Sequence, residues 1–271
     1  MTAPPFGHPT FKGGQQIGKN INEEALLLSK EENEFRWNRK KEVVFLLLNL
    51  NFTPTIESMT HPIQINDQNF VLHSTGALFW KEERMLLISD VHLGKVSHFR
   101  KYGAAVPQQA IEKNFELLTE IVSVFEPRTI CFLGDLFHSS LNSEWHRFES
   151  WISEQTSKII LVAGNHDIIS PLKYEDIGIL VIQELVLPPF LMTHHPEERN
   201  GYFNFSGHIH PAIKLKGMGR QLLKLPCFFK KQQQMVLPAF GEFTGTHILT
   251  PTKEDEVYAI TKNEVILVAK K

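Results

Sequence analysis

Residues 85–95 read MLLISDVHLGK, and the architecture of the chain can be worked out from this segment. The apolar run Met85–Ser89 predicts a buried strand, and Asp90 stands where that strand ends. Alternation along the chain puts the side chains of Asp90 and His92 on the same side. In open α/β sheets, sites lie beyond the carboxyl ends of the strands, so we expect these two side chains at a functional site.

The same pattern returns twice downstream. The apolar run Thr129–Leu133 is closed by Gly134-Asp135. The run Lys158–Ala163 is closed by Gly164-Asn165-His166-Asp167. Polar side chains therefore follow the carboxyl end of each of the three predicted strands.

Predicted helices separate these runs. A long amphipathic helix opens at Pro107, and a second over Ser143–Gln155 has Ser143 as its predicted N-cap. Strand–helix alternation predicts βαβ units with parallel strand pairing. After Ile179 the helical signal fades, and short apolar runs predict a second, mostly antiparallel half. These runs are Phe190–Thr193, Phe203–Ser206, Met235–Leu237, Val257–Ile260 and Val265–Val268.

The composition describes a folded protein of nearly balanced charge. Of 271 residues, 42% are hydrophobic, which excludes a chain that is disordered throughout. Lys and Arg number 28 against 30 Asp and Glu, which excludes binding of nucleic acid by bulk positive charge but leaves a local basic groove open. Two cysteines, Cys131 and Cys227, exclude a disulfide framework and are expected to fill core space in a reducing cytoplasm. The apolar run Val43–Leu50 is far shorter than the ~20 residues that cross a bilayer, so no membrane segment is expected.

The chain changes character at Met59. Residues 1–58 form an N-terminal extension in which Met1–Lys19 is rich in Pro and Gly and Glu23–Lys41 is dense in charge. Such a composition buries little, so we expect the extension to be poorly ordered. The alternative is that Met59 is the true start and that residues 1–58 are translated upstream sequence. Residues 59–271 are expected to form one domain that carries the chemistry.

Five short segments carry side chains of the types that bind metal ions. Taken singly, each is ordinary, because an Asp after a strand is commonly a turn former. Turn formation does not explain why all five occur in this order, each at the end of an apolar run. A mixed Asp/Asn/His set suits Mn, Fe or Zn and exceeds what one tetrahedral zinc needs, so we expect two divalent ions. The segments are Asp90-Val91-His92, Gly134-Asp135, Gly164-Asn165-His166-Asp167, Thr193-His194-His195 and Gly207-His208-Ile209-His210.

In this order the segments resemble the signature of the calcineurin-like metallophosphoesterases, which is D-x-H, G-D, G-N-H-[DE], H and G-H-x-H. The likeness extends from about Met59 to the C-terminus. Residues 90–95, 99–103 with Pro107, 134–139 and 237–245 resemble, more narrowly, the bacterial DNA ligase-associated subgroup. Its members are encoded beside a DNA ligase and a helicase and are assigned to DNA repair. The resemblance implies an α/β fold, a two-sheet α/β/β/α sandwich.

The resemblance also implies a role for each matching residue. One of His194 and His195 would bind metal; position favours His194, directly after the apolar run, and His195 is then expected to face the substrate. The implied ligands are Asp90, His92 and His210 for the first ion, Asp135 as the bridge, and Asn165, His194 and His208 for the second.

His166 is expected to be catalytic without binding metal. Two cations lower the pKa of a water held between them, which attacks the phosphodiester in line. His166 would stabilise the transition state or protonate the leaving oxygen, with Asp167 orienting its ring. Lys95 and Arg100 are expected to contact a nucleic-acid backbone, and a solvated loop is the alternative for both.

The leading function is a phosphodiesterase or endonuclease of DNA repair. Serine/threonine phosphatases of this fold carry an Arg soon after Gly-Asp and a Glu after Gly-Asn-His. This chain has Leu136-Phe137-His138-Ser139 and Asp167 instead, which favours diesters. We interpret His138 and Trp145 as structural or gating residues.

The expected cofactors are two Mn ions, with Fe or Zn as alternatives. The expected partners are DNA or another phosphodiester, together with a DNA ligase and a helicase of the same pathway, and the expected location is the cytoplasm. Two alternatives stay open. One is a phosphodiesterase of cyclic nucleotides or nucleotide lipids, and the other is a non-catalytic scaffold of the same fold.

Overall fold

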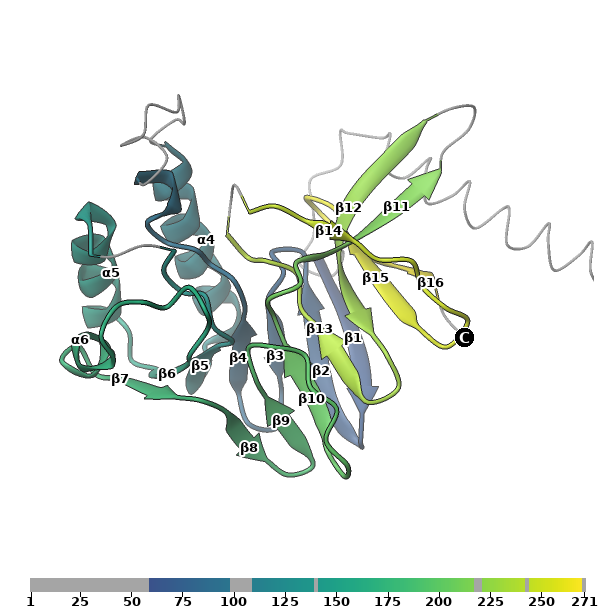
Figure 1. The fold of residues 1–271 in the computed structure, drawn as a ribbon, viewed down its shortest axis with the longest axis horizontal. Helices are drawn as coiled ribbons and strands as arrows, with labels where there is room; N and C mark the ends of the chain where they lie inside the picture. The colour runs from purple at the N-terminus through teal and green to yellow at the C-terminus, as the bar shows by residue number, and fades with distance from the viewer. Residues whose placement is uncertain (1–58, 98–108, 139–140, 217–220, 242–243, 270–271) are drawn as a thin grey trace, which may run out of the picture. The chain divides into compact units, whose positions relative to one another are not determined.

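In the part of the chain that it describes, the computed structural model has two β-sheets and three helices. Figure 1 shows how these elements are arranged. The chain divides into two units, Met1–Leu50 and Asn51–Lys271, and every described residue belongs to the second. The expected N-terminal extension, residues 1–58, lies outside the described residues. The structure describes residues 59–97, 109–138, 141–216, 221–241 and 244–269.

The first sheet contains the three strands predicted from the apolar runs. Its seven strands follow one another in chain order. Neighbours from β1 to β4 are antiparallel, whereas neighbours from β4 to β7 are parallel, as the strand–helix alternation predicts. The strands are β1 (Thr60–Ile65), β2 (Gln68–His73), β3 (Leu78–Trp80), β4 (Met85–Ile88), β5 (Thr129–Phe132), β6 (Lys158–Val162) and β7 (Ile179–Ile182).

Three helices connect the parallel strands: α4 (Gln109–Phe125), α5 (Ser143–Ser153) and α6 (Pro171–Glu175). The predicted N-cap of α5 was one residue too late. Asn142 is the cap, because its side-chain oxygen accepts the backbone N–H of Glu144 at 2.8 Å. Among the described helices, none is long and apolar enough to cross a bilayer.

The second sheet is mostly antiparallel, as predicted, and also contains three parallel pairs among the described strands. Strand β10 runs parallel to both β9 and β13, and β11 runs parallel to β14, while the other pairings among these strands are antiparallel. The strands are β8 (Leu185–Leu187), β9 (Phe190–Met192), β10 (Phe203–Ser206), β11 (Pro211–Lys216), β12 (Leu222–Lys230), β13 (Gln234–Val236), β14 (His247–Ile248), β15 (Glu256–Ile260) and β16 (Val265–Ala269).

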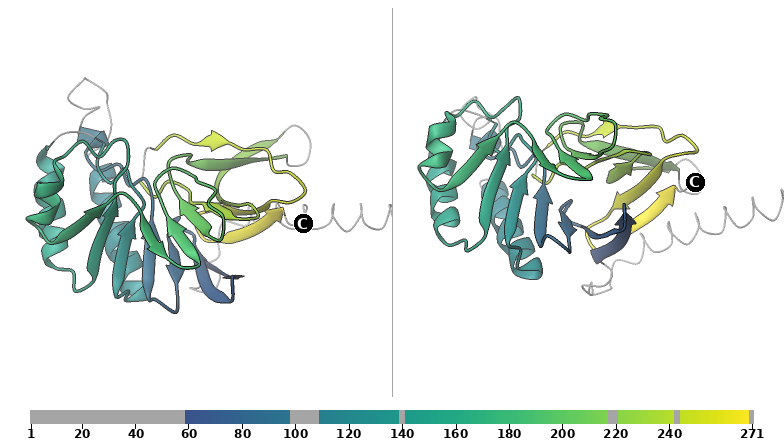
Figure 2. Two further views of the ribbon diagram at one scale, coloured as in Figure 1. Left: turned by 60° about the horizontal axis from the view of Figure 1, so that its bottom comes forward. Right: turned by 90° about the horizontal axis from the view of Figure 1, so that it is seen from below.

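The two sheets pack on each other and the helices pack on the first sheet (Figure 2). Along β4, Leu87 faces a core shared with Phe190 and Phe205 of the second sheet. Its neighbour Ile88 faces a core shared with Phe148 of α5. Burial on both faces explains why β4 reads as an uninterrupted apolar run. The two-sheet α/β sandwich is confirmed, and all the described helices lie on the first sheet.

Candidate metal centre

Five of the seven candidate ligands have a backbone conformation in the left-handed region. Asp90 and His92 follow β4 with φ of 53° and 52°, and Asp135 follows β5 with φ of 51°. His208 and His210, between β10 and β11, have φ of 68° and 50°. Non-glycine residues seldom adopt this conformation, which costs of order 1–3 kcal/mol where it is enforced. The chain therefore turns sharply at each of these residues, and their side chains converge.

The first group consists of Asp90, His92 and His210, whose ligand atoms lie within 4.8 Å of one another. His210 Nδ1 lies 3.0 Å from the carbonyl oxygen of Gly245, so Nδ1 carries the proton and donates it. This leaves Nε2 of His210 facing Asp90 Oδ1 at 3.2 Å and His92 Nε2 at 3.3 Å. These atoms form a cluster of electron-rich groups with room for a cation.

The pKa values of the two histidines in the first group are shifted in opposite directions. Burial, and then the charge of Lys95, lowers the pKa of His92 to about 2, so its imidazole is neutral and able to act as a ligand. Burial acts to lower the pKa of His210, but the neighbouring Asp90 carboxylate outweighs it and the pKa is raised. The position between Asp90 and His210 therefore favours positive charge.

The second group surrounds Nε2 of His194. This residue is buried, with 3% of its surface exposed. Its Nδ1 lies 2.9 Å from the Leu133 carbonyl and donates to it, so Nε2 presents its lone pair. That lone pair faces three further atoms that can bind a metal ion: Asn165 Oδ1 at 2.9 Å, His208 Nδ1 at 3.2 Å and Asp135 Oδ1 at 3.4 Å. A cation among these atoms would offset their mutual repulsion.

Asp135 lies between the two groups. Its Oδ1 is 3.4 Å from His194 Nε2, and its Oδ2 is 3.9 Å from His92 Nε2. The side chain is buried, so its charge needs compensation from within the protein. Each oxygen of this carboxylate thus faces a different group, which is the arrangement that a shared ligand requires.

The chemistry of the donor set fits a divalent metal ion. Asp90 is fully buried, yet Oδ1 has no hydrogen-bond partner among the described residues. Buried polar atoms are nearly always hydrogen-bonded, so an unsatisfied carboxylate oxygen indicates an ion or water. Imidazole nitrogens, carboxylates and an amide oxygen together fit divalent ions of the Mn, Fe and Zn type.

Both histidines of the His194-His195 pair are within reach of the second group. A ring nitrogen of each lies within 4.8 Å of one on His208, and the His195 ring centroid is 4.1 Å from that of His208. His194 is buried and faces Asp135, whereas His195 is exposed. The geometry places His194 inside the centre and His195 at its rim.

His166 lies beside the first group, with its ring centroid 5.6 Å from that of His92. The ring of His138 is closer, with its centroid 4.6 Å from that of His166 and its plane tilted by 31° from that of the His166 ring. His138 is thus a neighbour of the expected catalytic histidine. Trp145 is buried in the core and contacts Phe137, in agreement with its structural interpretation.

Asp167 has different contacts from those expected. Its carboxylate accepts the backbone N–H groups of Asp135 at 2.8 Å, Gly164 at 2.9 Å and Phe137 at 3.1 Å. A contact with the His166 ring is not among its interactions with described residues. Asp167 holds together the loops after β5 and β6, because its carboxylate accepts backbone N–H groups from both.

Glu144 supports the site, although nothing in the sequence singled it out. It is 1% exposed and accepts the backbone N–H of Gly94 at 2.7 Å and both the N–H and hydroxyl of Ser97 at 3.2 and 2.6 Å. An acidic residue in the first turn of a helix is common because it opposes the helix dipole. Only the folded chain shows that Glu144 instead holds the loop after Asp90 and His92.

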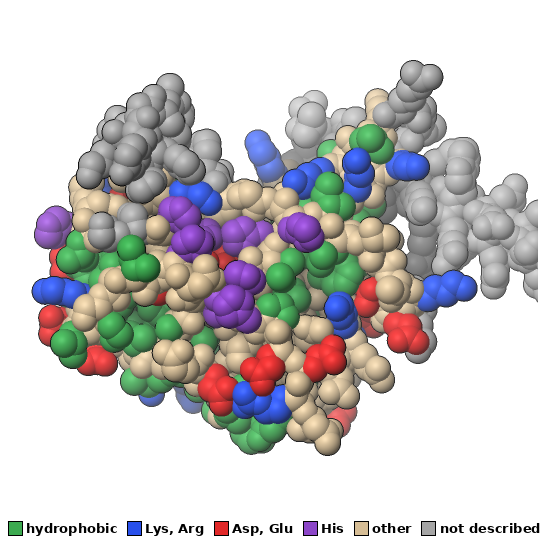
Figure 3. Space-filling view, in the orientation of Figure 1, with side chains coloured by type: hydrophobic (Ala, Val, Ile, Leu, Met, Phe, Trp, Pro, Cys, Tyr) green, Lys and Arg blue, Asp and Glu red, His purple; other side chains and the backbone are tan. Residues whose placement is uncertain are grey.

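Of the expected substrate contacts, Lys95 is half-buried beside the centre. Burial lowers its pKa, while Asp135 and Asp90 act in the opposite direction. Arg100 falls in residues 98–108, outside the described part of the chain. The histidine side chains form a patch on one face of the molecule (Figure 3).

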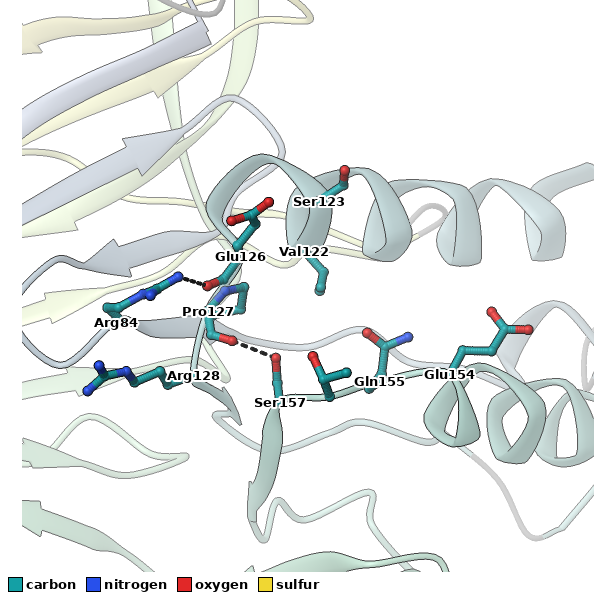
Figure 4. A pocket seen from close by; sticks show the side chains of 10 residues that line it. Arg84, Val122, Ser123, Glu126, Pro127, Arg128, Glu154, Gln155 and Ser157 are labelled. Atoms are coloured by element: carbon teal, nitrogen blue, oxygen red, sulfur yellow. Dashed lines mark hydrogen bonds between the residues drawn. The ribbon is translucent and has the colours of Figure 1, made fainter.

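A cavity of about 530 Å³ lies elsewhere (Figure 4). Its lining includes Arg84, Arg128 and Ser157, each of which directly precedes one of the strands β4, β5 and β6. The cavity is therefore at the amino ends of these strands, whereas the candidate ligands follow their carboxyl ends.

Comparison with known proteins defines the family. The model of the calcineurin-like phosphoesterase family matches residues 83–222, which is slightly more than half of the chain. The chain belongs to this family and is a metal-dependent phosphoesterase.

Among solved structures, the nuclease MPE of Pseudomonas putida is 30% identical with a TM-score of 0.66, and the match covers 77% of this chain and 99% of that protein. The phosphoesterase Yfce of E. coli is 15% identical with a TM-score of 0.38, covering 68% of this chain and 96% of the other, and this likeness carries no argument. Among curated proteins, none is significantly similar to the chain.

Proposed function

We propose that this protein is a two-metal phosphodiesterase that cleaves DNA and acts in DNA repair. The observation that carries the proposal is the position of Asp135, whose two carboxylate oxygens face two neighbouring groups of ligand atoms. Two-metal centres of this kind suit in-line displacement at phosphorus. The 30% identity with a nuclease over 77% of the chain supports a nucleic-acid substrate.

The proposed ligands follow from the two groups. The first ion takes Asp90, His92 and His210; the second takes Asn165, His194 and His208; Asp135 is shared. Mn is the proposed metal, since this mixed oxygen and nitrogen set suits borderline divalent ions. When bound, the two cations would lower the pKa of a water molecule, which then serves as the nucleophile, and would neutralise the charge of the phosphodiester.

His166 is the proposed catalytic side chain that is not a ligand. Its backbone N–H donates to Asp135 Oδ1 at 2.8 Å, which places its ring next to the first group. From there it stabilises charge on the phosphate or gives a proton to the leaving oxygen. Asp167 is a positioning residue, which holds the loop of His166 against that of Asp135.

The proposal is tested with the full chain stripped of metal by a chelator and reloaded with Mn, Fe or Zn. We expect metal-dependent hydrolysis of an aryl phosphodiester and cleavage of DNA. Asp135→Asn should lose both metal and activity, whereas Asp176→Asn, the same change at an exposed site, should keep them. If DNA stays intact while cyclic nucleotides are hydrolysed, a small-molecule phosphodiesterase replaces the proposal.

We further propose a cytoplasmic location and residues 59–271 as the metallophosphoesterase domain. The free, buried thiols of Cys131 and Cys227 support a reducing compartment. A pathway shared with a DNA ligase and a helicase rests on the resemblance of the motifs to the ligase-associated subgroup. Co-purification of a ligase with the tagged protein from its native cells would test that pathway.

A further inference from the structure

The hairpin of β11 and β12 has two chemically different faces. Ile213 and Leu225 lie opposite each other and join the apolar cluster formed with β15. The alternate residues Lys214, Lys216 and Lys224 are exposed. Because side chains alternate along a strand and cross-strand partners share a face, these three lysines project from the side that does not pack on the core.

The lysine face is not neutralised by the hairpin itself. Lys214 and Lys224 are directly paired across the two strands, an arrangement of like charges that destabilises a sheet. Residues 211–241 contain six Lys and Arg and no Asp or Glu. No carboxylate in the described ranges forms an ion pair with Lys214, Lys216 or Lys224. A cost of this kind is expected where the charge serves binding.

The hairpin that carries the lysine face begins next to the candidate metal centre. His210 directly precedes β11, and its Nδ1 donates to the carbonyl of Gly245 at 3.0 Å. The ammonium of Lys224 donates to the next carbonyl, that of Thr246, at 3.0 Å. Figure 3 shows Lys and Arg side chains gathered on the hairpin beside the histidine patch.

We propose that Lys214, Lys216 and Lys224 bind the phosphate backbone of the nucleic-acid strand that is cut at the metal centre. This inference rests on the proposed function. Residues two apart on a strand are separated by about 6.6–6.8 Å, a distance of the same order as that between successive phosphates of an extended strand. Such contacts orient a strand without reading its sequence. An acidic protein segment matches the charge, but not the position beside a phosphodiester-cleaving centre.

The test uses the full chain with Lys214→Gln and Lys216→Gln together. Lys224 is left unchanged so that it keeps its hydrogen bond to the Thr246 carbonyl. Binding of a single-stranded oligonucleotide is measured by fluorescence anisotropy with chelator present, over a range of salt concentrations. Loss of two phosphate contacts should reduce the slope of log affinity against log salt by about 1.4. With Mn, KM for DNA should rise several-fold, while kcat/KM for an aryl phosphodiester stays unchanged.

Two control proteins separate charge from other effects. Lys81→Gln with Lys158→Gln removes the same charge from exposed lysines near the amino ends of β4 and β6, and the salt slope should not change. Lys214→Arg with Lys216→Arg keeps the charge and should keep the slope. Thermal unfolding of the Gln pair should be unchanged or at a higher temperature, since the repulsion of Lys224 is relieved.

Three results would overturn the inference. In the first, the unmodified protein binds and cuts DNA, but the variant with Lys214→Gln and Lys216→Gln has the same slope of log affinity against log salt. The hairpin then does not bind the strand, while the proposed function stands. If the unmodified protein hydrolyses the aryl diester but binds no DNA, the nucleic-acid substrate itself is wrong. If a polyglutamate peptide binds through these lysines and DNA does not, the partner is an acidic protein.

Discussion

A methyl group added to Gly164 would collide with both the Oδ1 and the backbone nitrogen of Asp135. That same oxygen accepts the backbone N–H of His166 and faces Nε2 of His194 at 3.4 Å. The loop after β6 is therefore packed directly on the proposed bridging carboxylate. A residue with a Cβ atom has no space at this position, so a glycine that reads as an ordinary turn residue is required by the site.

Gly164→Ala should displace Asp135 and thereby weaken metal binding and abolish phosphodiesterase activity. Gly178→Ala is the matched control, because no described atom lies within 4 Å of the added methyl group there. Gly178 has φ of +83°, so its substitution should cost about 1–2 kcal/mol of stability while activity is retained. Metal content, activity and thermal unfolding of both variants measure the difference. Full activity in Gly164→Ala would contradict the close packing.

Asp167→Asn should destabilise the site by about 2 kcal/mol. The carboxylate accepts three backbone N–H groups, and an amide would turn its own NH₂ donors toward at least one of them. Calorimetric unfolding and Mn titration should both show the loss, because the loops after β5 and β6 separate. Asp176→Asn, at an exposed side chain, should change neither. A loss of kcat alone, with unchanged stability, would favour the original expectation that Asp167 orients His166.

His166→Gln should lower kcat by about 10²- to 10⁴-fold while metal content stays the same. The two proposed roles predict different dependence on the leaving group. Protonation of the leaving oxygen matters little for nitrophenolate and greatly for a nucleoside, whereas stabilisation of phosphate charge matters for both. His146→Gln, at an exposed position on α5, serves as the control and should have no effect. Loss of metal from His166→Gln would instead make His166 a ligand.

His73, at the end of β2, should make the fold sensitive to acid. The side chain is 2% exposed, and burial lowers its pKa to about 4. The unfolded chain binds a proton near pH 6.5 and the native protein only near pH 4, so protonation favours unfolding in this interval. The contribution of neutral His73 to the free energy of unfolding is therefore fully present above about pH 6.5. It falls by up to about 3 kcal/mol as the pH decreases toward 4.

His73→Asn tests this pH dependence. The Asn Oδ1 can replace Nδ1 as the acceptor of the Thr75 N–H. Denaturant unfolding of both proteins between pH 7 and pH 4 should show a shallower loss of stability for the variant. Parallel curves would mean that His73 does not carry the effect.

The parallel part of the first sheet could be predicted from the sequence because its strands are buried on both faces. Such strands leave uninterrupted apolar runs, and β4, β5 and β6 each fall within a predicted run. Strand β1 was not predicted. Its residues alternate between exposed and half-buried, and an alternating pattern is weaker in a short segment than a continuous run.

Local sequence also determined which side chains follow the strand ends, because alternation and turn chemistry act over a few neighbouring residues. It could not determine the partners of Asp167 and Glu144. Their carboxylates accept backbone N–H groups that are about 30 and 50 residues away along the chain. Backbone donors look the same in every sequence, so only the tertiary fold decides which of them a buried carboxylate meets. The lysine face of the β11–β12 hairpin likewise depends on the register of the two strands, which pairs Lys214 with Lys224.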